Sequence, residues 1–283
     1  MSQSVLCLFI TYLANLHVGL ANGTIRTYLA AIRYLHILRD LPEPRSIPMP
    51  KLSLVERGIQ RMKSSKLSGQ QRLPITPSIL RQIRALWSTR AHEFDIVMLW
   101  AACCTAFFGF FRMGEITSAT TRGQQHDRGV MVDNVAVNNP HNPTMVKIHL
   151  KCSKTDQYGK GFDIYMGRTG EDLCPVSALL AYLAIRGNVP GPLFLLKDGC
   201  FLTKDIFIAE VRAALAALGL DSSTYAGHSF RIGAATTAAE IGIEDSMIKM
   251  LGRWNSSAYQ LYVRASRQAL ASVSQRLVSP QDR

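Results

Sequence analysis

The residues best suited to chemistry lie close together near the C-terminus of this chain. His228 and Arg231 are three positions apart, so a helix would place both side chains on one face. Trp254, Tyr259 and Tyr262 follow them. An arginine binds phosphate through a bidentate fork, a histidine can donate a hydrogen bond to it, and a tyrosine can attack it. The combination favours a phosphate-directed site; the alternative is a surface His and Arg beside packed aromatic side chains.

The amino-acid sequence of this stretch resembles that of a known family. The motifs GHSFRIGAAT and LGRWNSSAYQLYVR resemble the C-terminal signature of the tyrosine recombinase (phage integrase) family, and most of all its branch in eukaryotic mobile elements. The resemblance implies a protein that cuts DNA through a tyrosine, without a metal ion or cofactor. The family elements occur in order along the chain: Arg112, Lys154, His228 with Arg231, Trp254, and Tyr262.

Two of these elements lie outside the C-terminal motif. Arg112 and Glu115 match the family's first arginine and its supporting acid, although an exposed i,i+3 ion pair would have the same spacing. Lys154 lies in the Gly-containing turn KCSKTDQYGKG and best matches the catalytic lysine. Lys151 and Lys160 remain alternatives, because lysine is common in turns.

The spacing within the C-terminal motif departs from the family pattern. Counted from Arg231, the position of the family's His or Trp falls on Trp254, but counted back from Tyr262 it falls on Arg253. Either side chain could therefore contact the phosphate. Tyr262 stands at the family position of the nucleophile, whereas Tyr259 is closer to the tryptophan than the pattern allows.

The resemblance implies a role for each site residue. The two arginines would stabilise the charge that builds on the non-bridging phosphate oxygens, and the His and Trp would add N–H donors. Tyr262 would be the nucleophile that forms a covalent 3′-phosphotyrosine, and Lys154 would protonate the departing 5′ oxygen. Because the phosphotyrosine keeps the bond energy, strand exchange would need no ATP.

Hydrophobic periodicity predicts the scaffold for this site: a mainly α-helical protein with a small β-sheet in its C-terminal part. Residues 1–69 are predicted to be all helical, and TIRTYLAAIRYLH resembles the family's helical core-binding domain. That domain usually has more helices, which leaves an incomplete N-terminus open. Residues 70–283 resemble the catalytic domain.

Local patterns predict most elements of both domains. In the first, Asn22-Gly23 should break an N-terminal helix, and Thr24 should cap the next. In the second, a strongly apolar helix is predicted just before the first arginine. The main predicted elements there are a helix at 94–108, strands at 130–137, 144–150 and 162–165, and helices at 175–186 and 263–277.

The charge of the chain points to a polyanionic partner. The net charge is +12 and the sequence pI about 9.7. Residues 51–90 hold nine Lys or Arg and one Glu, a net charge of +8 around the predicted domain junction. A solvated charged surface is the alternative, but phosphate contact is favoured. The candidate DNA-binding residues are Arg26, Arg33, Arg57, Arg61, Lys63, Lys66 and Arg72.

Other features exclude several classes of protein. The six cysteines show neither a CxxC pair nor zinc-ligand spacing. The apolar residues 5–21 lack a basic n-region and are interrupted by polar side chains, so we expect a helix without a membrane span.

Double-stranded DNA is the expected partner, with no small-molecule substrate. The expected location is the nucleus in a eukaryote and the cytoplasm otherwise.

The expected assembly also comes from the resemblance. Family members act as homo-oligomers, tetrameric on DNA, in which the helix after the nucleophile docks on a neighbouring protomer. For the predicted helix at 263–277 the alternative is packing on its own domain. Three other functions stay open: a type IB topoisomerase, a domesticated DNA-binding protein without activity, and a helical nucleic-acid-binding scaffold with an accidental motif.

Overall fold

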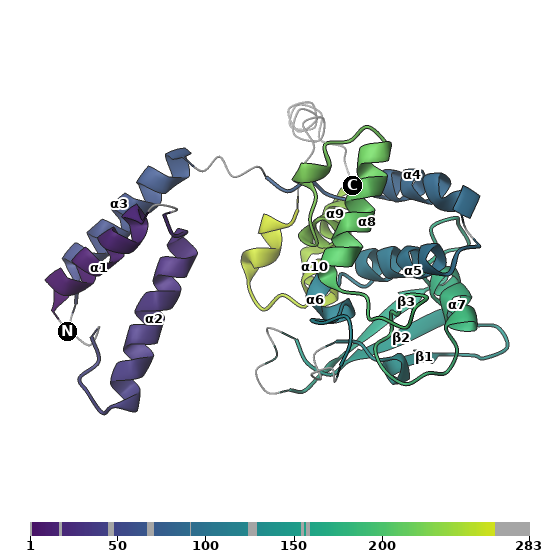
Figure 1. The fold of residues 1–283 in the computed structure, drawn as a ribbon, viewed down its shortest axis with the longest axis horizontal. Helices are drawn as coiled ribbons and strands as arrows, with labels where there is room; N and C mark the ends of the chain where they lie inside the picture. The colour runs from purple at the N-terminus through teal and green to yellow at the C-terminus, as the bar shows by residue number, and fades with distance from the viewer. Residues whose placement is uncertain are drawn as a thin grey trace, which may run out of the picture. The chain divides into compact units, whose positions relative to one another are not determined.

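The chain forms two compact units, Met1–Gln71 and Arg72–Arg283 (Figure 1). The computed structural model describes residues 2–16, 19–44, 48–66, 71–90, 92–123, 129–153, 156 and 159–263. The division lies close to the boundary expected after residue 69. Because the two units are separate compact bodies, each has its own hydrophobic core.

The first unit is helical in the residues that the structure describes. Its helices are α1 (Gln3–Asn15), α2 (Asn22–Leu38) and α3 (Pro50–Lys66). All three contribute apolar side chains at helical spacing to one small core. The buried members of this core are Leu6, Ile10, Leu13, Ile25, Leu29, Leu52 and Ile59.

The start of α2 differs from the sequence prediction. The helix begins at Asn22, so Asn22 and Gly23 form its first turn instead of breaking the chain, and Thr24 lies inside the helix and is not its cap. A glycine in a helix costs about 1 kcal/mol relative to alanine. Ile25 and Leu29, in the first half of α2, are buried in the core, and the free energy gained by burying their side chains outweighs that cost.

The second unit is built around α5 (Phe94–Phe108), at the position predicted for the strongly apolar helix. This helix is buried on nearly all sides, as a helix that is apolar all round must be. It packs against α7 (Pro175–Arg186) and α9 (His228–Glu240). The remaining helices shown in Figure 1 are α4 (Pro77–Trp87), α6 (Met113–Ile116), α8 (Lys204–Ala217) and α10 (Asp245–Gly252).

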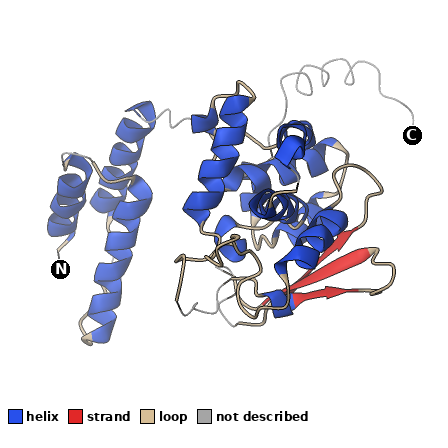
Figure 2. Ribbon diagram, turned by 45° about the vertical axis from the view of Figure 1, so that its right-hand side comes forward, coloured by secondary structure: helices blue, strands red, loops and turns tan. Residues whose placement is uncertain are grey.

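One small antiparallel sheet lies beside these helices (Figure 2). Its strands, in spatial order, are β1 (Val135–Val137), β2 (Met145–Leu150) and β3 (Phe162–Gly167). Alternate residues of β2 are buried, and Ile148 pairs with both Val135 and Ile164. The prediction of a mainly α-helical protein with a small sheet is confirmed.

The first strand is shorter than the sequence predicted. Residues 132–134 form a 3₁₀ turn, and only 135–137 pair with β2. The side chain of Asn134 accepts a hydrogen bond from the backbone N–H of Met131 at 3.0 Å. This local bond closes the turn and competes with strand pairing.

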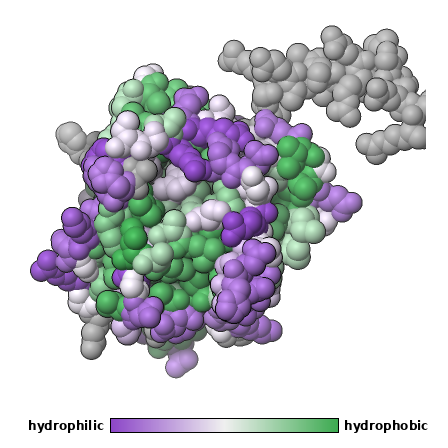
Figure 3. Space-filling view, turned by 90° about the vertical axis from the view of Figure 1, so that its right-hand side faces the viewer, coloured by the Kyte–Doolittle hydropathy of each residue, from purple (hydrophilic) through white to green (hydrophobic). Residues whose placement is uncertain are grey.

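Two predicted features lie wholly or largely outside the described residues. They are Lys154 and, beyond Val263, the helix at 263–277. Within the part of the chain that is described, no helix is both long and apolar enough to cross a membrane. Figure 3 shows one face on which hydrophobic side chains gather in a central area bordered by hydrophilic ones, a mixture that is ordinary for a folded protein.

The position of α9 depends on a close backbone approach at Gly233. A Cβ atom added there would lie 1.8 Å from the carbonyl oxygen of Ile75. The extended segment before α4 runs along the start of α9, where the N–H of Ile75 donates to the carbonyl of Ser229 at 2.9 Å. Only glycine allows this approach, and the same helix carries His228 and Arg231.

We therefore expect Gly233→Ala to lower the free energy of unfolding of the second unit by about 2 kcal/mol, because overpacking against backbone cannot be relieved by a rotamer change. The helix-propensity gain of alanine, about 1 kcal/mol, is too small to offset it. Denaturant titration followed by circular dichroism measures the decrease. Gly114→Ala is the control, since apart from its chain neighbours and its own helix backbone no atom lies within 4 Å of the added Cβ. Equal stabilities of the two variants would contradict the prediction.

Candidate active site

The ring of Tyr262 lies within a cluster of three other predicted site residues. Its centroid is 5.1 Å from that of Trp254 and 6.1 Å from that of His228. The guanidinium carbon of Arg231 lies 5.6 Å from the same ring. The fold thus brings two side chains of α9 together with two from the segment that follows α10. A phosphate beside the phenol would meet cationic and N–H donors.

The backbone of Tyr262 is held from two sides. It follows the 3₁₀ helix Ser257–Leu261, and its N–H donates to the carbonyl of Tyr259 at 2.8 Å. Its carbonyl oxygen accepts a hydrogen bond from the hydroxyl of Thr236, on α9, at 3.2 Å. The half-buried phenol is therefore tied to the helix that carries His228.

Arg231 is completely buried, with 0% of its surface exposed. Its Nη1 donates to the carbonyl oxygen of Phe110 at 2.6 Å, and its Nη2 donates to the carbonyl oxygen of Gly252. The guanidinium carbon lies 4.0 Å from the centroid of the Trp254 ring. These contacts fix the plane of the guanidinium between the turn that precedes α6 and the end of α10.

Arg112 lies at the start of α6 and is paired with Glu115, as its spacing allows. The backbone N–H and Nη1 of Arg112 each donate to a different oxygen of this carboxylate, both at 2.8 Å. The Arg112 side chain is 18% exposed and that of Glu115 is 6% exposed. The pair is thus largely buried and is not the exposed ion pair that the alternative interpretation required.

The site carries more positive than negative charge. Arg112, Arg231 and Arg253 lie around one carboxylate, that of Glu115. Burial lowers the pKa of Arg231 to about 9; Arg112 and Arg253 act in the same direction, while Glu115 and Tyr262 oppose it. Arg231 therefore keeps its proton at neutral pH. An anion such as a phosphate diester would relieve the repulsion among the three guanidiniums.

The two candidates for the His or Trp position have different surroundings. Trp254 is half-buried, and its ring contacts both Arg231 and Tyr262. Arg253 is buried, and its guanidinium bonds to Glu115 and to backbone carbonyls. Trp254 is therefore the side chain that lies beside the phenol.

Tyr259 has a different environment from Tyr262. Its side chain is 3% exposed, and its hydroxyl donates to the carboxylate of Asp245. This hydrogen bond is the main cause that raises the pKa of Tyr259. A buried phenol that is harder to deprotonate and is already bonded is poorly suited to attack a phosphate.

Two positioning features of the site escaped the sequence motifs. The carbonyl of Phe110 accepts a hydrogen bond from Arg231 and another from Arg253, but a backbone acceptor leaves no trace in residue type. A Cβ on Gly252 would lie 1.6 Å from the Trp254 ring, so a glycine is needed there. The Leu251-Gly252 pair before Arg253 was the sequence pattern from which this glycine could have been predicted.

The loop predicted to hold the catalytic lysine is described only in part. Lys154 lies outside the described residues, while Lys151 and Lys160 are exposed. The carboxylate of Asp156 accepts from the N–H groups of Lys160 and Gly161 at 3.1 and 2.8 Å, which closes the turn. Among the described residues, no cluster of three or more His, Cys, Asp or Glu is placed to hold a metal ion.

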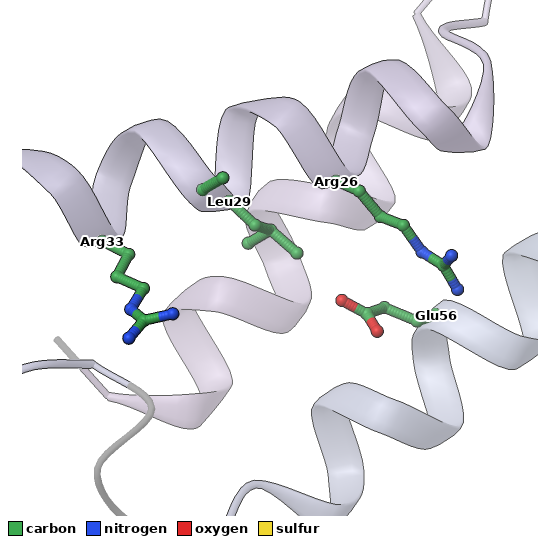
Figure 4. A pocket seen from close by; sticks show the side chains of 5 residues that line it. Arg26, Leu29, Arg33 and Glu56 are labelled. Atoms are coloured by element: carbon green, nitrogen blue, oxygen red, sulfur yellow. The ribbon is translucent and has the colours of Figure 1, made fainter. Parts of the chain in front are cut away.

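Two of the predicted DNA-binding arginines line a groove in the first unit. Arg26 and Arg33, on one face of α2, surround a cavity of about 370 Å³ with Leu29, Ala30 and Glu56. In Figure 4 the Arg26 guanidinium and the Glu56 carboxylate extend toward the same space between α2 and α3. Arg33 also forms an ion pair with Glu43. The groove therefore carries two arginines together with the carboxylates of Glu56 and Glu43, which belong to the same unit.

The remaining predicted DNA-binding residues are less uniform. Arg57 and Arg61 are exposed on α3, where Arg57 donates to the carbonyl of Ser53 at 3.3 Å. The ammonium group of Lys63 donates to the carbonyl of Leu20, a hydrogen bond within the first unit. Arg72 is exposed and donates to the carbonyl of Ser223. The Lys66 side chain lies outside the described part of α3.

Comparison with known proteins identifies solved structures with a similar fold. No family model matches the sequence, and no curated protein matches it significantly. Solved structures do match. The XerH site-specific recombinase in a post-cleavage complex with a palindromic difH substrate has a TM-score of 0.65 and 15% identity, covering 99% of this chain and 71% of that one.

Two further solved structures agree. XerA recombinase has a TM-score of 0.55 and 14% identity, over 100% of this chain and 84% of that one. A lambda integrase dimer bound to a COC′ core site has a TM-score of 0.51 and 15% identity, over 92% and 76% of the two chains. At such low identity the likeness concerns the fold, and the chain has the fold of the tyrosine recombinases and integrases.

Proposed function

We propose that this protein breaks and rejoins DNA strands through a covalent tyrosine intermediate, in site-specific recombination or in the integration of a mobile element. One observation carries the proposal: the ring of Tyr262 lies against Trp254, His228 and Arg231. This cluster places a nucleophile beside a buried guanidinium and two N–H-bearing rings, which can stabilise the charge that develops during attack on a phosphodiester. The fold shared with recombinases supports the same function.

The proposed chemistry uses the side chains in distinct roles. The Tyr262 oxygen attacks the scissile phosphorus and loses its proton to solvent, and the bond from phosphorus to the 5′ oxygen breaks. Arg112 and Arg231 stabilise the charge on the non-bridging oxygens, and His228 and Trp254 donate hydrogen bonds. Attack by a 5′-hydroxyl of another strand on the 3′-phosphotyrosine reverses the step.

Lys154 completes the proposed set as the general acid that protonates the departing 5′ oxygen. This assignment rests on the sequence resemblance alone. Double-stranded DNA is the proposed partner. A homo-oligomer, tetrameric on DNA, is the proposed assembly, because two duplexes must be cut and rejoined together. The wording GHSFRIGAAT supports a place in the branch found in eukaryotic mobile elements, with nuclear location.

The test must work without a known target site. We would incubate the protein with a randomised library of nicked duplexes, in which cleavage releases a short strand and traps the protein on DNA. Protein-linked DNA is then isolated under denaturing conditions and sequenced, and the linked peptide is identified by mass spectrometry. An adduct at Tyr262 supports the proposal. Binding without adduct favours a domesticated DNA-binding protein, and relaxation of supercoiled plasmid without recombinants favours a topoisomerase.

DNA affinity should depend on salt through the exposed arginines of α3. We expect Arg57→Gln with Arg61→Gln to flatten the slope of log affinity against log salt by about 0.9 for each phosphate that the protein no longer neutralises. Fluorescence anisotropy with a labelled duplex measures the slope.

Arg90→Gln is the matched control for this experiment. Arg90 is exposed, but its guanidinium already pairs with Glu93 through bonds of 2.8 and 2.7 Å. Its replacement should leave the salt dependence unchanged. A slope that does not change in the Arg57 and Arg61 variant either would show that this face of α3 does not bind phosphate.

A further inference from the structure

Arg253 occupies a backbone conformation that usually belongs to glycine. It follows the last residue of α10 with φ of 54° and ψ of 47°, the left-handed region. Its N–H donates to the carbonyl of Met250, and the next N–H, of Trp254, donates to the carbonyl of Lys249. This is the hydrogen-bond pattern of a helix end that favours glycine. An arginine is strained here, so its side-chain contacts must compensate.

Those contacts use the guanidinium inside the protein. Nη2 of Arg253 donates to the Glu115 carboxylate at 2.7 Å and to the carbonyl of Phe110 at 3.1 Å. Nη1 donates to the carbonyls of Gly109 and Leu251 at 3.1 and 3.3 Å. The side chain is 4% exposed. The fork is thus directed at the turn between α5 and α6, and Nη1 and Nη2 bond to the protein itself, whereas the buried Nε has no hydrogen-bond partner among the described residues.

Glu115 joins this arginine to the first one. One carboxylate oxygen, Oε2, accepts from both Arg253 Nη2 and the backbone N–H of Arg112, and Oε1 accepts from Arg112 Nη1. The Phe110 carbonyl, in turn, accepts from both Arg253 and Arg231. Phe110 is itself left-handed, with φ of 49°. Two strained residues are therefore bonded to each other at the junction of the two arginine-bearing segments.

We propose that Arg253 is a positioning residue, which joins the loop leading to Tyr262 to the Arg112 turn through the shared Glu115 carboxylate. This inference rests on the proposed function and assigns to Arg253 a role other than phosphate contact. The nucleophile loop leaves α10 at Arg253, so a shift there moves Trp254 and Tyr262 relative to Arg112. A displacement of about 1 Å in such a site costs about 100-fold in rate.

The test compares Arg253→Lys with Arg186→Lys. Lysine keeps the charge but cannot reach a carboxylate and several carbonyls in one plane. Arg186 is a matched control: it is buried and donates to the carbonyls of Gly187, Val189, Pro192 and Leu193. With saturating nicked DNA selected from the random library, we measure the single-turnover rate of adduct formation, the Kd and the Tm of each protein.

We expect Arg253→Lys to slow adduct formation about 100-fold with little change in Kd, whereas Arg186→Lys lowers the Tm and keeps the rate of the folded protein. Glu115→Gln should also be slow, and Arg253→Lys should slow it little further, because both act through one carboxylate. An unchanged rate in Arg253→Lys, equal rate decreases in the two Arg→Lys variants, or decreases that multiply in the double variant would each overturn the proposal.

A second variant covers a failure of Arg253→Lys to fold. Arg253→Gln combined with Glu115→Gln removes both charges of the buried Arg253–Glu115 pair together, so this double variant is expected to fold and to react slowly. A folded double variant with the wild-type rate overturns the inference. Absence of adduct from the wild-type protein overturns the proposed function and this inference with it, whereas wild-type adduct with unaffected variants overturns the inference alone.

Discussion

Tyr262→Phe is expected to remove all covalent protein–DNA adduct while DNA binding stays nearly intact. The substitution deletes only the phenolic oxygen, so the ring can keep its place against Trp254 and His228. Without that oxygen no phosphotyrosine can form, and the adduct should disappear completely. Denaturing gels of the reaction with nicked duplexes detect the adduct, and anisotropy measures binding.

Tyr259→Phe is the matched control, because it deletes the same atom three residues away. Tyr259 is buried and bonded to Asp245, so its replacement should weaken the 3₁₀ turn and lower adduct yield far less. Adduct that survives in Tyr262→Phe but disappears in Tyr259→Phe would reverse the assignment. It would also require another role for Trp254.

Arg231→Lys should lower the rate of adduct formation by about 10²–10³-fold, the typical decrease when one preorganised donor to a developing oxyanion is removed. Lysine keeps the positive charge but has no planar fork to bond Phe110 and Gly252 together. It also cannot stack on the Trp254 ring as the guanidinium does at 4.0 Å. The remaining charge would sit on a mobile amine instead of a fixed plane.

The rate must be separated from stability, because Arg231 is fully buried. We would measure single-turnover rates at a temperature well below the Tm, with the folded fraction determined by circular dichroism. Arg186→Lys again provides the control, since it removes comparable hydrogen bonds to carbonyls away from the Tyr262 cluster. If the rate falls by the same small factor in both variants, Arg231 supports the fold and does not stabilise the reacting phosphate.

Local patterns predicted much of the scaffold correctly. Helix α5 begins and ends where its apolar run does, and α7 runs from Pro175 to Arg186 as expected for a proline at the first helical position. The Arg112–Glu115 pair could also be anticipated, because both side chains belong to one helical turn. In each case the decisive interactions lie within a few residues, which is the range that spacing describes.

Local patterns failed where more distant contacts or competing turns decide. Packing of Ile25 and Leu29 starts α2 at Asn22 despite its Asn-Gly pair, and a turn closed by Asn134 shortens the first strand. Sequence spacing also could not choose between Arg253 and Trp254, since the two counts disagreed by one residue.

By itself the sequence determined which chemistry is present: the order of arginines, histidine, tryptophan and tyrosines, and the helices that carry most of them. Only the tertiary structure decided which of them meet. Arg231 bonds to Phe110 across 121 positions and Arg253 to Glu115 across 138, so their directions depend on how α6, α9 and α10 pack around α5. The left-handed end of α10 and the buried Glu115 carboxylate direct the Arg253 side chain into the protein, and Trp254 is left beside Tyr262. The physical reason is that a buried guanidinium needs hydrogen-bond acceptors, and the packed tertiary structure decides where these acceptors lie.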